Sequence, residues 1–301
     1  MSLRSRRGVT KTWCGNPLSA MPAKTRCRVF HSALVVLCSL VAAVLSGCGG
    51  GGYADPNAIA RTFDIGGRSL YLSCSGSGRP TVVMDAGLGN THETWHAVAP
   101  TISKRTRTCT YDRANLGASD AAPKPRTSAE VVSDLQRLLS VAKIRPPYVL
   151  VGHSFGGLDV RLFASDHPKE VSALVLVDPT PTAFLRGECA LVSASLCADL
   201  RHGWDPSNNP DGLDFVKSAN ELDHARALPD IPVIVLAATN HQQAAITDPG
   251  IEKRIEALWQ REQRQLAASV PHGKLILVPS GHDIQELHPD AVTAAITSLL
   301  H

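Results

Sequence analysis

Aromatic residues are scarce in this 301-residue sequence, at 5%, so it offers no obvious stacking platform for sugars or nucleobases. It contains no phosphate-binding loop and no nicotinamide-binding fingerprint, and its cysteines lack metal-ligand spacing. The apolar run from Ala33 to Leu45 is too short to favour a membrane-spanning helix. Because the phosphate-binding, nicotinamide-binding and metal-binding patterns are absent, we expect no cofactor and no metal.

Acidic residues are absent from residues 1–48, which carry seven Lys or Arg. Taking these seven from the total of 30 leaves 23 basic residues against 27 acidic ones, although the whole chain has a formal net charge of +3. The remainder of the chain is thus mildly acidic. Because nucleic-acid binding needs a basic surface, we expect no nucleic-acid partner.

Residues 1–48 are predicted to be an export signal, with Met21 as a candidate true start. A basic region precedes the apolar run, which ends in Leu45-Ser46-Gly47-Cys48 and resembles the lipobox of bacterial lipoprotein signals. That resemblance implies lipidation of Cys48 and a membrane anchor on the outer face of the cytoplasmic membrane. Residues 49–58 would form a flexible tether. An ordinary secretory signal, which would give a soluble exported protein, is the alternative.

Four cysteines follow the leader: Cys74, Cys109, Cys189 and Cys197. An even number in an oxidising compartment predicts two disulfides, and three pairings are possible.

The segment Gly152-His153-Ser154-Phe155-Gly156 has the form Gly-x-Ser-x-Gly. An apolar, strand-like run precedes it and a helix-like pattern follows. This arrangement is typical of a nucleophile elbow, a sharp strand-to-helix turn that exposes the serine hydroxyl beside free helix N–H groups.

Strand-like and helix-like segments alternate over residues 59–301, except at 180–229, where a region rich in Asp, Asn, Pro and Gly is predicted to be a lid insertion. This alternation predicts a mostly parallel central sheet with helices on both faces. The expected strands are 61–65, 69–73, 81–84, 106–111, 148–151, 171–177, 232–238 and 274–278, and the clearest helices are 95–102, 128–142, 249–268 and 289–300.

Five segments in this order resemble the α/β-hydrolase family, over roughly residues 60–301. They are Asp85-Ala86-Gly87-Leu88-Gly89, Tyr111-Asp112-Arg113, Gly152-His153-Ser154-Phe155-Gly156, Leu176-Val177-Asp178-Pro179 and Ser280-Gly281-His282-Asp283. The resemblance implies an α/β-hydrolase fold in which the first two strands form a hairpin and the second lies beside the fourth. It also implies the pairings Cys74–Cys109 and Cys189–Cys197.

The family's catalytic residues map onto Ser154 as nucleophile and His282 as base, with the backbone N–H groups of Leu88 and Phe155 as the oxyanion hole. Asp178 is the favoured triad acid, because the family's usual position, after the strand at 232–238, lacks a carboxylate until Asp248. Asp248 stays open as the acid, as do Asp283 and a water-bridged substitute.

Three neighbours of these residues are assigned supporting roles. His153 is expected to form part of the elbow wall, and Asp112 and Arg113 are expected to be structural.

A serine nucleophile argues against the dehalogenase and epoxide-hydrolase branches, which use a carboxylate. The favoured function is hydrolysis of a small-molecule carboxylic ester through an acyl-enzyme, with no obligate protein partner. Two alternatives remain. One is a proline-iminopeptidase-like aminopeptidase, in which Glu188 or Glu221 of the lid binds a free amino terminus; the other is a non-catalytic envelope lipoprotein that binds a ligand.

Overall fold

The computed structural model describes residues 55–240 and 246–300. The predicted signal peptide, the Cys48 lipidation site and the tether as far as residue 54 lie outside the described residues.

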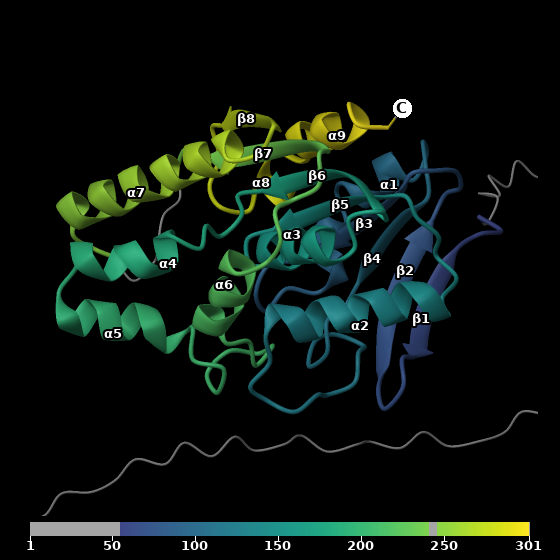
Figure 1. Cartoon of the computed structure of the whole chain (residues 1–301), viewed down its shortest axis with the longest axis horizontal. Coiled ribbons are helices and arrows are strands. Elements are labelled where there is room, and N and C mark those ends of the chain that lie inside the picture. Colours follow the sequence, from purple (N-terminus) through teal and green to yellow (C-terminus); the bar gives the residue numbers. More distant parts are fainter. Residues whose placement is uncertain (1–54, 241–245, 301) are drawn as a thin grey trace, which may run out of the picture. The chain divides into compact units, whose positions relative to one another are not determined.

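An eight-stranded sheet forms the centre of the described part (Figure 1), in the order β1-β2-β4-β3-β5-β6-β7-β8. The first two strands form an antiparallel hairpin, β2 pairs antiparallel with β4, and all other neighbours are parallel. The expected mostly parallel sheet, with the second strand beside the fourth, is confirmed. The strands are β1 (Ile59–Asp64), β2 (Ser69–Ser75), β3 (Thr81–Asp85), β4 (Thr108–Tyr111), β5 (Tyr148–His153), β6 (Val171–Val177), β7 (Pro232–Ala238) and β8 (His272–Val278).

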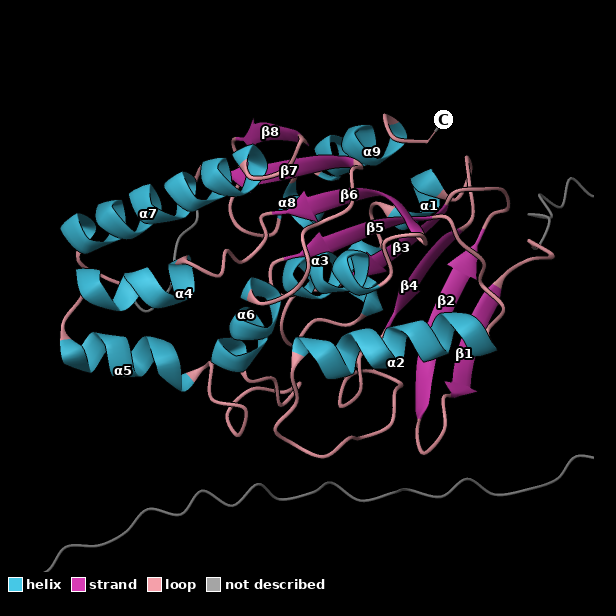
Figure 2. Cartoon of the chain, in the orientation of Figure 1, coloured by secondary structure: helices cyan, strands magenta, loops and turns pink. Residues whose placement is uncertain are grey.

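Helices cover both faces of this sheet (Figure 2) because its central strands are apolar on both sides. In β5, Leu150 joins one core while Val149 and Val151 join the other. The first core is closed by α2 (Ser128–Val141), α3 (Gly156–Asp166) and the end of α7 (Pro249–Ala268). The second is closed by η1 (His92–Trp95), α1 (Ala99–Ile102), α8 (Ile284–Leu287) and α9 (Pro289–Thr297).

One helix expected from the sequence is wrong in detail. Residues 95–102 do not form a single helix; the chain makes the short helices η1 and α1 instead. Pro100 lies in the first turn of α1, where its missing N–H costs no hydrogen bond, so it favours a helix start at this point.

The region between β6 and β7 contains four short helices: α4 (Phe184–Gly187), η2 (Glu188–Leu191), α5 (Ala194–His202) and α6 (Phe215–Asp223). Figure 1 shows α4, α5 and α6 on the side toward which the arrowheads of the parallel strands point. The sequence shows only weak helical patterning here, and the structure gives the reason: α5 has no buried residue, so it needs no apolar face.

Two disulfides are present, with the pairings that the resemblance implies. Cys74 and Cys109 are register partners on β2 and β4, with Cα atoms 4.1 Å apart. Cys189 of η2 is bonded to Cys197 of α5, with Cα atoms 5.0 Å apart.

The buried apolar residues of the described part all lie between Ile65 and Ile296. A chain that begins at residue 52 therefore keeps both cores, the whole sheet and both disulfides. None of the helices in residues 55–240 and 246–300 combines the length and the apolar character that crossing a membrane requires.

Candidate active site

Ser154 occupies the turn between β5 and α3 with a φ of +51°, in the left-handed region that a serine rarely adopts. The turn is tight enough to exclude side chains at two flanking positions. A Cβ on Gly152 would lie 2.4 Å from the Gly156 carbonyl oxygen, and one on Gly156 would lie 2.6 Å from the Ala86 carbonyl oxygen. The Gly-x-Ser-x-Gly spacing is thus a steric requirement of this turn, and the sequence predicts its geometry correctly.

Ser154 and His282 line the same two adjoining cavities, of about 270 and 420 Å³. Leu200, Trp204 and Phe215 also line both cavities, so the shared wall is apolar and comes from the region between β6 and β7. The described residues include no hydrogen bond from the Ser154 hydroxyl. Ser154 and His282 therefore face one space, and no hydrogen bond between them is present among the described residues.

Asp178 follows β6, with a φ of +40°, and its side chain is fully buried. Its Oδ2 lies 2.7 Å from Nδ1 of His282. Its Oδ1 accepts hydrogen bonds from the Ala238 N–H at 3.0 Å and from Nε1 of Trp259 at 2.9 Å. Two donors thus fix the carboxylate against His282. When Nδ1–H of the imidazole donates to Asp178, Nε2 is left unprotonated and able to accept a proton.

The two other candidate acids lie elsewhere. Asp248 is exposed and caps α7, where its Oδ1 accepts from the N–H groups of Gly250 and Ile251 at 2.8 and 2.9 Å. The Asp283 side chain is 51% exposed, and its Oδ1 lies 3.7 Å from Nε2 of His153. Of the three carboxylates, Asp178 is the one hydrogen-bonded to His282.

His153 is buried behind His282, with ring centroids 4.7 Å apart. Its Nε2 lies 3.2 Å from the His282 carbonyl oxygen, so it contacts the backbone of the candidate base. A Cβ on Gly87 would lie 2.8 Å from Nδ1 of His153 and 3.3 Å from the Ser154 Cβ, which shows how closely the loop after β3 approaches the turn.

The backbone N–H groups of Leu88 and Phe155 flank Ser154 from two different elements. Leu88 belongs to the loop after β3 and lines the larger cavity, and Phe155 is the N-cap of α3. Within the described residues neither amide donates a hydrogen bond to a protein group. Both donors are therefore available to a developing oxyanion, and their assignment as the oxyanion hole stays a prediction.

Arg113, expected to be structural, holds the loop that carries Leu88. Its guanidinium donates to Asp85 Oδ1 at 2.7 Å and to the Gly87 carbonyl at 2.6 Å, and it contacts Asp211 Oδ2 at 3.2 Å. The same Asp211 oxygen accepts from the Gly89 N–H at 2.8 Å. Asp211 comes from the region between β6 and β7, and the sequence offers no signal for its part in this network.

Asp112 has a structural role as well. Its Oδ1 accepts from the His92 N–H at 2.7 Å, and its Oδ2 accepts from the Ala118 N–H at 3.0 Å.

The two candidate amine-binding carboxylates of the lid lie in different places. Glu188 is fully buried and lines the 270 Å³ cavity beside Ser154. Glu221 accepts a hydrogen bond from the Ala129 N–H at the start of α2. In the described ranges, no group of three His, Cys, Asp or Glu side chains could hold a metal ion.

Comparison with known proteins agrees with this architecture. A model of the α/β-hydrolase fold matches residues 80–210. The uncharacterized protein YqjL of Bacillus subtilis (strain 168) is 28% identical over 243 residues, which cover 79% of this chain and 90% of that protein.

Among solved structures, the enol-lactonase from Burkholderia xenovorans LB400 is similar with a TM-score of 0.58 and 18% identity, covering 79% of this chain and 99% of the lactonase. A thermophilic esterase from Thermogutta terrifontis gives a TM-score of 0.55 and 19% identity, covering 80% of this chain and 97% of the esterase. This chain therefore has the α/β-hydrolase fold, and its similarity to that family supports hydrolase activity.

Proposed function

We propose that this protein is a serine hydrolase that cleaves carboxylic esters, with Ser154 as nucleophile, His282 as base and Asp178 as the triad acid. The observation that carries the proposal is the 2.7 Å hydrogen bond between His282 Nδ1 and a buried, doubly anchored Asp178, beside a cavity that Ser154 also lines. The two unpaired N–H groups of Leu88 and Phe155 support it further.

In the proposed reaction, Nε2 of His282 takes the Ser154 hydroxyl proton as Oγ bonds to the ester carbonyl carbon. The carbonyl oxygen gains the negative charge and accepts hydrogen bonds from Leu88 and Phe155. His282 then gives its proton to the departing alkoxide, which leaves as the alcohol. Water, activated by the same imidazole, attacks the acyl-enzyme and releases the carboxylic acid and free Ser154.

Two cavities that meet at Ser154 suit a substrate with a group on each side of the scissile bond. The shared apolar wall of Leu200, Trp204 and Phe215 favours an uncharged acyl or alcohol group over a sugar or a nucleotide. The basic leader and the Leu45-Ser46-Gly47-Cys48 segment support export and a lipid anchor at Cys48, on the outer face of the cytoplasmic membrane.

The test is hydrolysis of p-nitrophenyl butyrate by purified protein, with Ser154→Ala, Asp178→Asn and Asp248→Asn compared with wild type. Removing a triad member costs several powers of ten in kcat. We expect kcat to fall by several powers of ten in Ser154→Ala and Asp178→Asn, and Asp248→Asn to remain active. A loss of kcat in Asp248→Asn but not in Asp178→Asn would overturn the assignment of the acid. A folded wild type that is inactive and that a serine-directed phosphonate fails to label would favour the binding lipoprotein.

A second candidate, the aminopeptidase, gains support from the position of Glu188. This buried carboxylate shares the 270 Å³ cavity with Ser154, where it could meet a substrate ammonium group. A prolyl arylamide distinguishes the two activities. Preference for the arylamide over the butyrate ester, abolished by Glu188→Gln and not by Glu221→Gln, would favour the aminopeptidase.

A further inference from the structure

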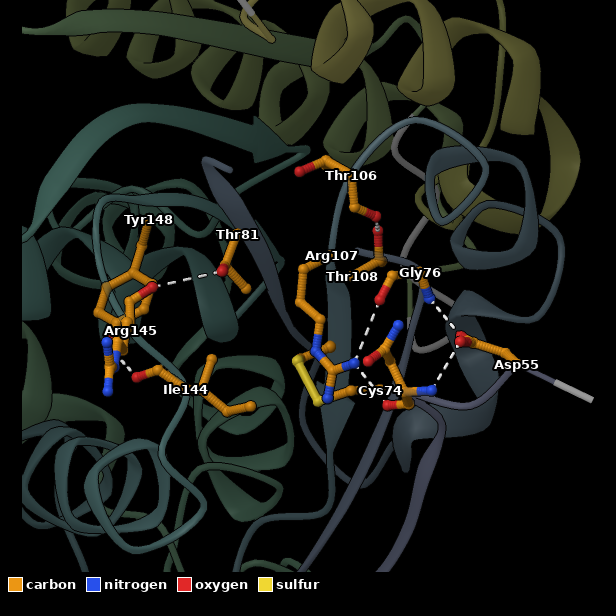
Figure 3. Close-up of a disulfide and its surroundings, with 12 residues drawn as sticks. Asp55, Cys74, Gly76, Thr81, Thr106, Arg107, Thr108, Ile144, Arg145 and Tyr148 are labelled. Carbon is orange, nitrogen blue, oxygen red and sulfur yellow. Dashed lines mark hydrogen bonds between the residues drawn. A yellow bond between two sulfur atoms is a disulfide. The ribbon is translucent and has the colours of Figure 1, made fainter. Parts of the chain in front are cut away.

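A separate cavity of about 440 Å³ lies at the end of the sheet where the parallel strands begin, opposite the end that carries Ser154. The parallel strands β3, β4 and β5 begin near it, and their carboxyl ends lead toward the candidate active site. We call it the basic pocket because Arg79, Arg107, Lys143 and Arg145 line it, and its described lining includes no acidic side chain. Figure 3 shows Arg107 and Arg145 with their neighbours near the Cys74–Cys109 disulfide.

Arg107 has the Asp55 carboxylate nearby, and the other three cations have no neighbouring carboxylate partner among the described residues. Within residues 55–240 and 246–300, none of them forms an ion pair with an acidic side chain. Arg79, Lys143 and Arg145 are exposed, and Arg107 is half-buried, with its guanidinium donating to the carbonyl oxygens of Asn57 and Gly76. The three uncompensated charges around one hollow repel one another, and a bound anion relieves that repulsion.

The loop between β2 and β3 adds uncharged donors to the same hollow. Gly76 and Gly78 have φ angles of +75° and +108°, and both glycines and Ser77 line the pocket. The N–H groups of Ser77 and Gly78 donate no hydrogen bond among the described residues. Free backbone N–H groups beside clustered cations suit the oxygens of a phosphate group.

The course of the chain indicates where such a phosphate would come from. Asp55 is bound at the basic pocket, with Oδ2 accepting from the Gly76 N–H at 2.6 Å and Oδ1 from the Asn57 N–H at 2.8 Å. Cys48 precedes Asp55 by seven residues, a span of at most about 25 Å when fully extended. A lipid on Cys48 would thus keep the basic pocket within reach of phospholipid headgroups.

We propose that the basic pocket binds the phosphate group of anionic phospholipids and turns this end of the sheet toward the membrane. Each Lys or Arg near an anionic bilayer surface contributes about 1 kcal/mol, equivalent to about fivefold in partitioning. Binding at the pocket is independent of the proposed ester hydrolysis, because no residue that lines it lines the two cavities at Ser154.

The experiment is co-sedimentation of residues 52–301, which lack the lipidated cysteine, with vesicles of phosphatidylcholine alone or mixed with phosphatidylglycerol. We expect binding to the mixed vesicles only, weakened by added salt. Arg79→Gln/Arg145→Gln should lower the partition coefficient about 30-fold and leave ester hydrolysis unchanged. The control Lys253→Gln/Arg264→Gln removes two exposed cations from α7 and should lower it less than threefold.

An equal fall in the partition coefficient of both double variants would overturn the proposal, because the attraction to the vesicles would then depend on overall charge alone. So would equal binding to both kinds of vesicle. Thermal stabilisation of the protein by inorganic phosphate, lost in Arg79→Gln/Arg145→Gln and without preference for phosphatidylglycerol vesicles, would assign the pocket to free phosphate instead.

Discussion

At the scale of single residues, Asp159 of α3 is a carboxyl group buried in the core. Neither of its oxygens forms a well-aligned hydrogen bond among the described residues. Burial raises the pKa of Asp159 well above its usual range, and the charge of nearby Asp85 raises it further, although the Ser128 hydroxyl lies close enough to lower the pKa in part. The folded protein therefore holds this group protonated at pH values where the unfolded chain releases the proton.

The pH dependence of stability follows from that difference. Below the unfolded pKa of about 3.9 both states are protonated, and Asp159 contributes no pH dependence. Above it the unfolded chain is deprotonated and the folded protein is not, so stability falls as pH rises toward the folded pKa. The side-chain amide in the variant Asp159→Asn cannot titrate. We expect the free energy of unfolding of this variant, relative to wild type, to improve by up to about 1.4 kcal/mol per pH unit above pH 4.

Urea unfolding of both proteins at pH 4, 5, 6 and 7 measures this difference. If the difference in the free energy of unfolding between Asp159→Asn and wild type stays constant with pH, the carboxyl group ionises in the folded protein.

At the scale of elements, α7 begins at a cap formed by Asp248. Asp248 satisfies two orphan N–H groups of its first turn, while Trp259, which donates to Asp178, lies further along the helix. Asp248→Ala should lower the free energy of unfolding by about 1 kcal/mol and leave kcat/KM for p-nitrophenyl butyrate unchanged. Asp248→Asn keeps a capping oxygen and should restore most of that stability. A fall in kcat/KM with Asp248→Ala would show that the cap also positions Trp259.

The Cys189–Cys197 disulfide secures α5, which otherwise packs on the domain through partly buried residues such as Leu200. No residue of α5 is buried, yet Leu200 of α5 lines both cavities at Ser154. In Cys189→Ser/Cys197→Ser we expect KM to rise about fivefold, the effect of about 1 kcal/mol of lost preorganisation, with kcat nearly unchanged. The matched pair Cys74→Ser/Cys109→Ser removes a buried bond between strands and should lower Tm without changing KM. A loss of kcat in the first pair would indicate that α5 positions catalytic groups.

At the scale of the whole molecule, the described part has its two candidate sites at opposite ends of the parallel strands of one sheet. The basic pocket lies where β3, β4 and β5 begin, and Ser154 lies where β5 ends. A protein bound through the basic pocket therefore presents its substrate cavities to water rather than to the bilayer. We expect phosphatidylglycerol vesicles to leave kcat/KM for p-nitrophenyl butyrate unchanged within about twofold. Strong activation by vesicles would contradict this orientation.

The sequence predicts the sheet well, because buried parallel strands are continuous apolar runs and the segments between them have helical periodicity. It also places Ser154 and His282 in one site, since the resemblance rests on short motifs in a fixed order. It leaves Asp178 and Asp248 open as acids, because the choice depends on which loop lies beside His282 in space.

Two features could not be predicted because their residues are scattered along the chain. Asp211 reaches Arg113 and Gly89 from a region without a sequence pattern. The cations of the basic pocket come from three separate segments and are brought together only by strand pairing.

The bond between Cys189 and Cys197 also determines how this protein would respond to a protease that cuts between them. Residues 193–195 are exposed between the two cysteines. Cleavage there opens the backbone, but the two pieces stay covalently linked through sulfur. The nicked chain would migrate as one band on a non-reducing gel and as two bands after reduction.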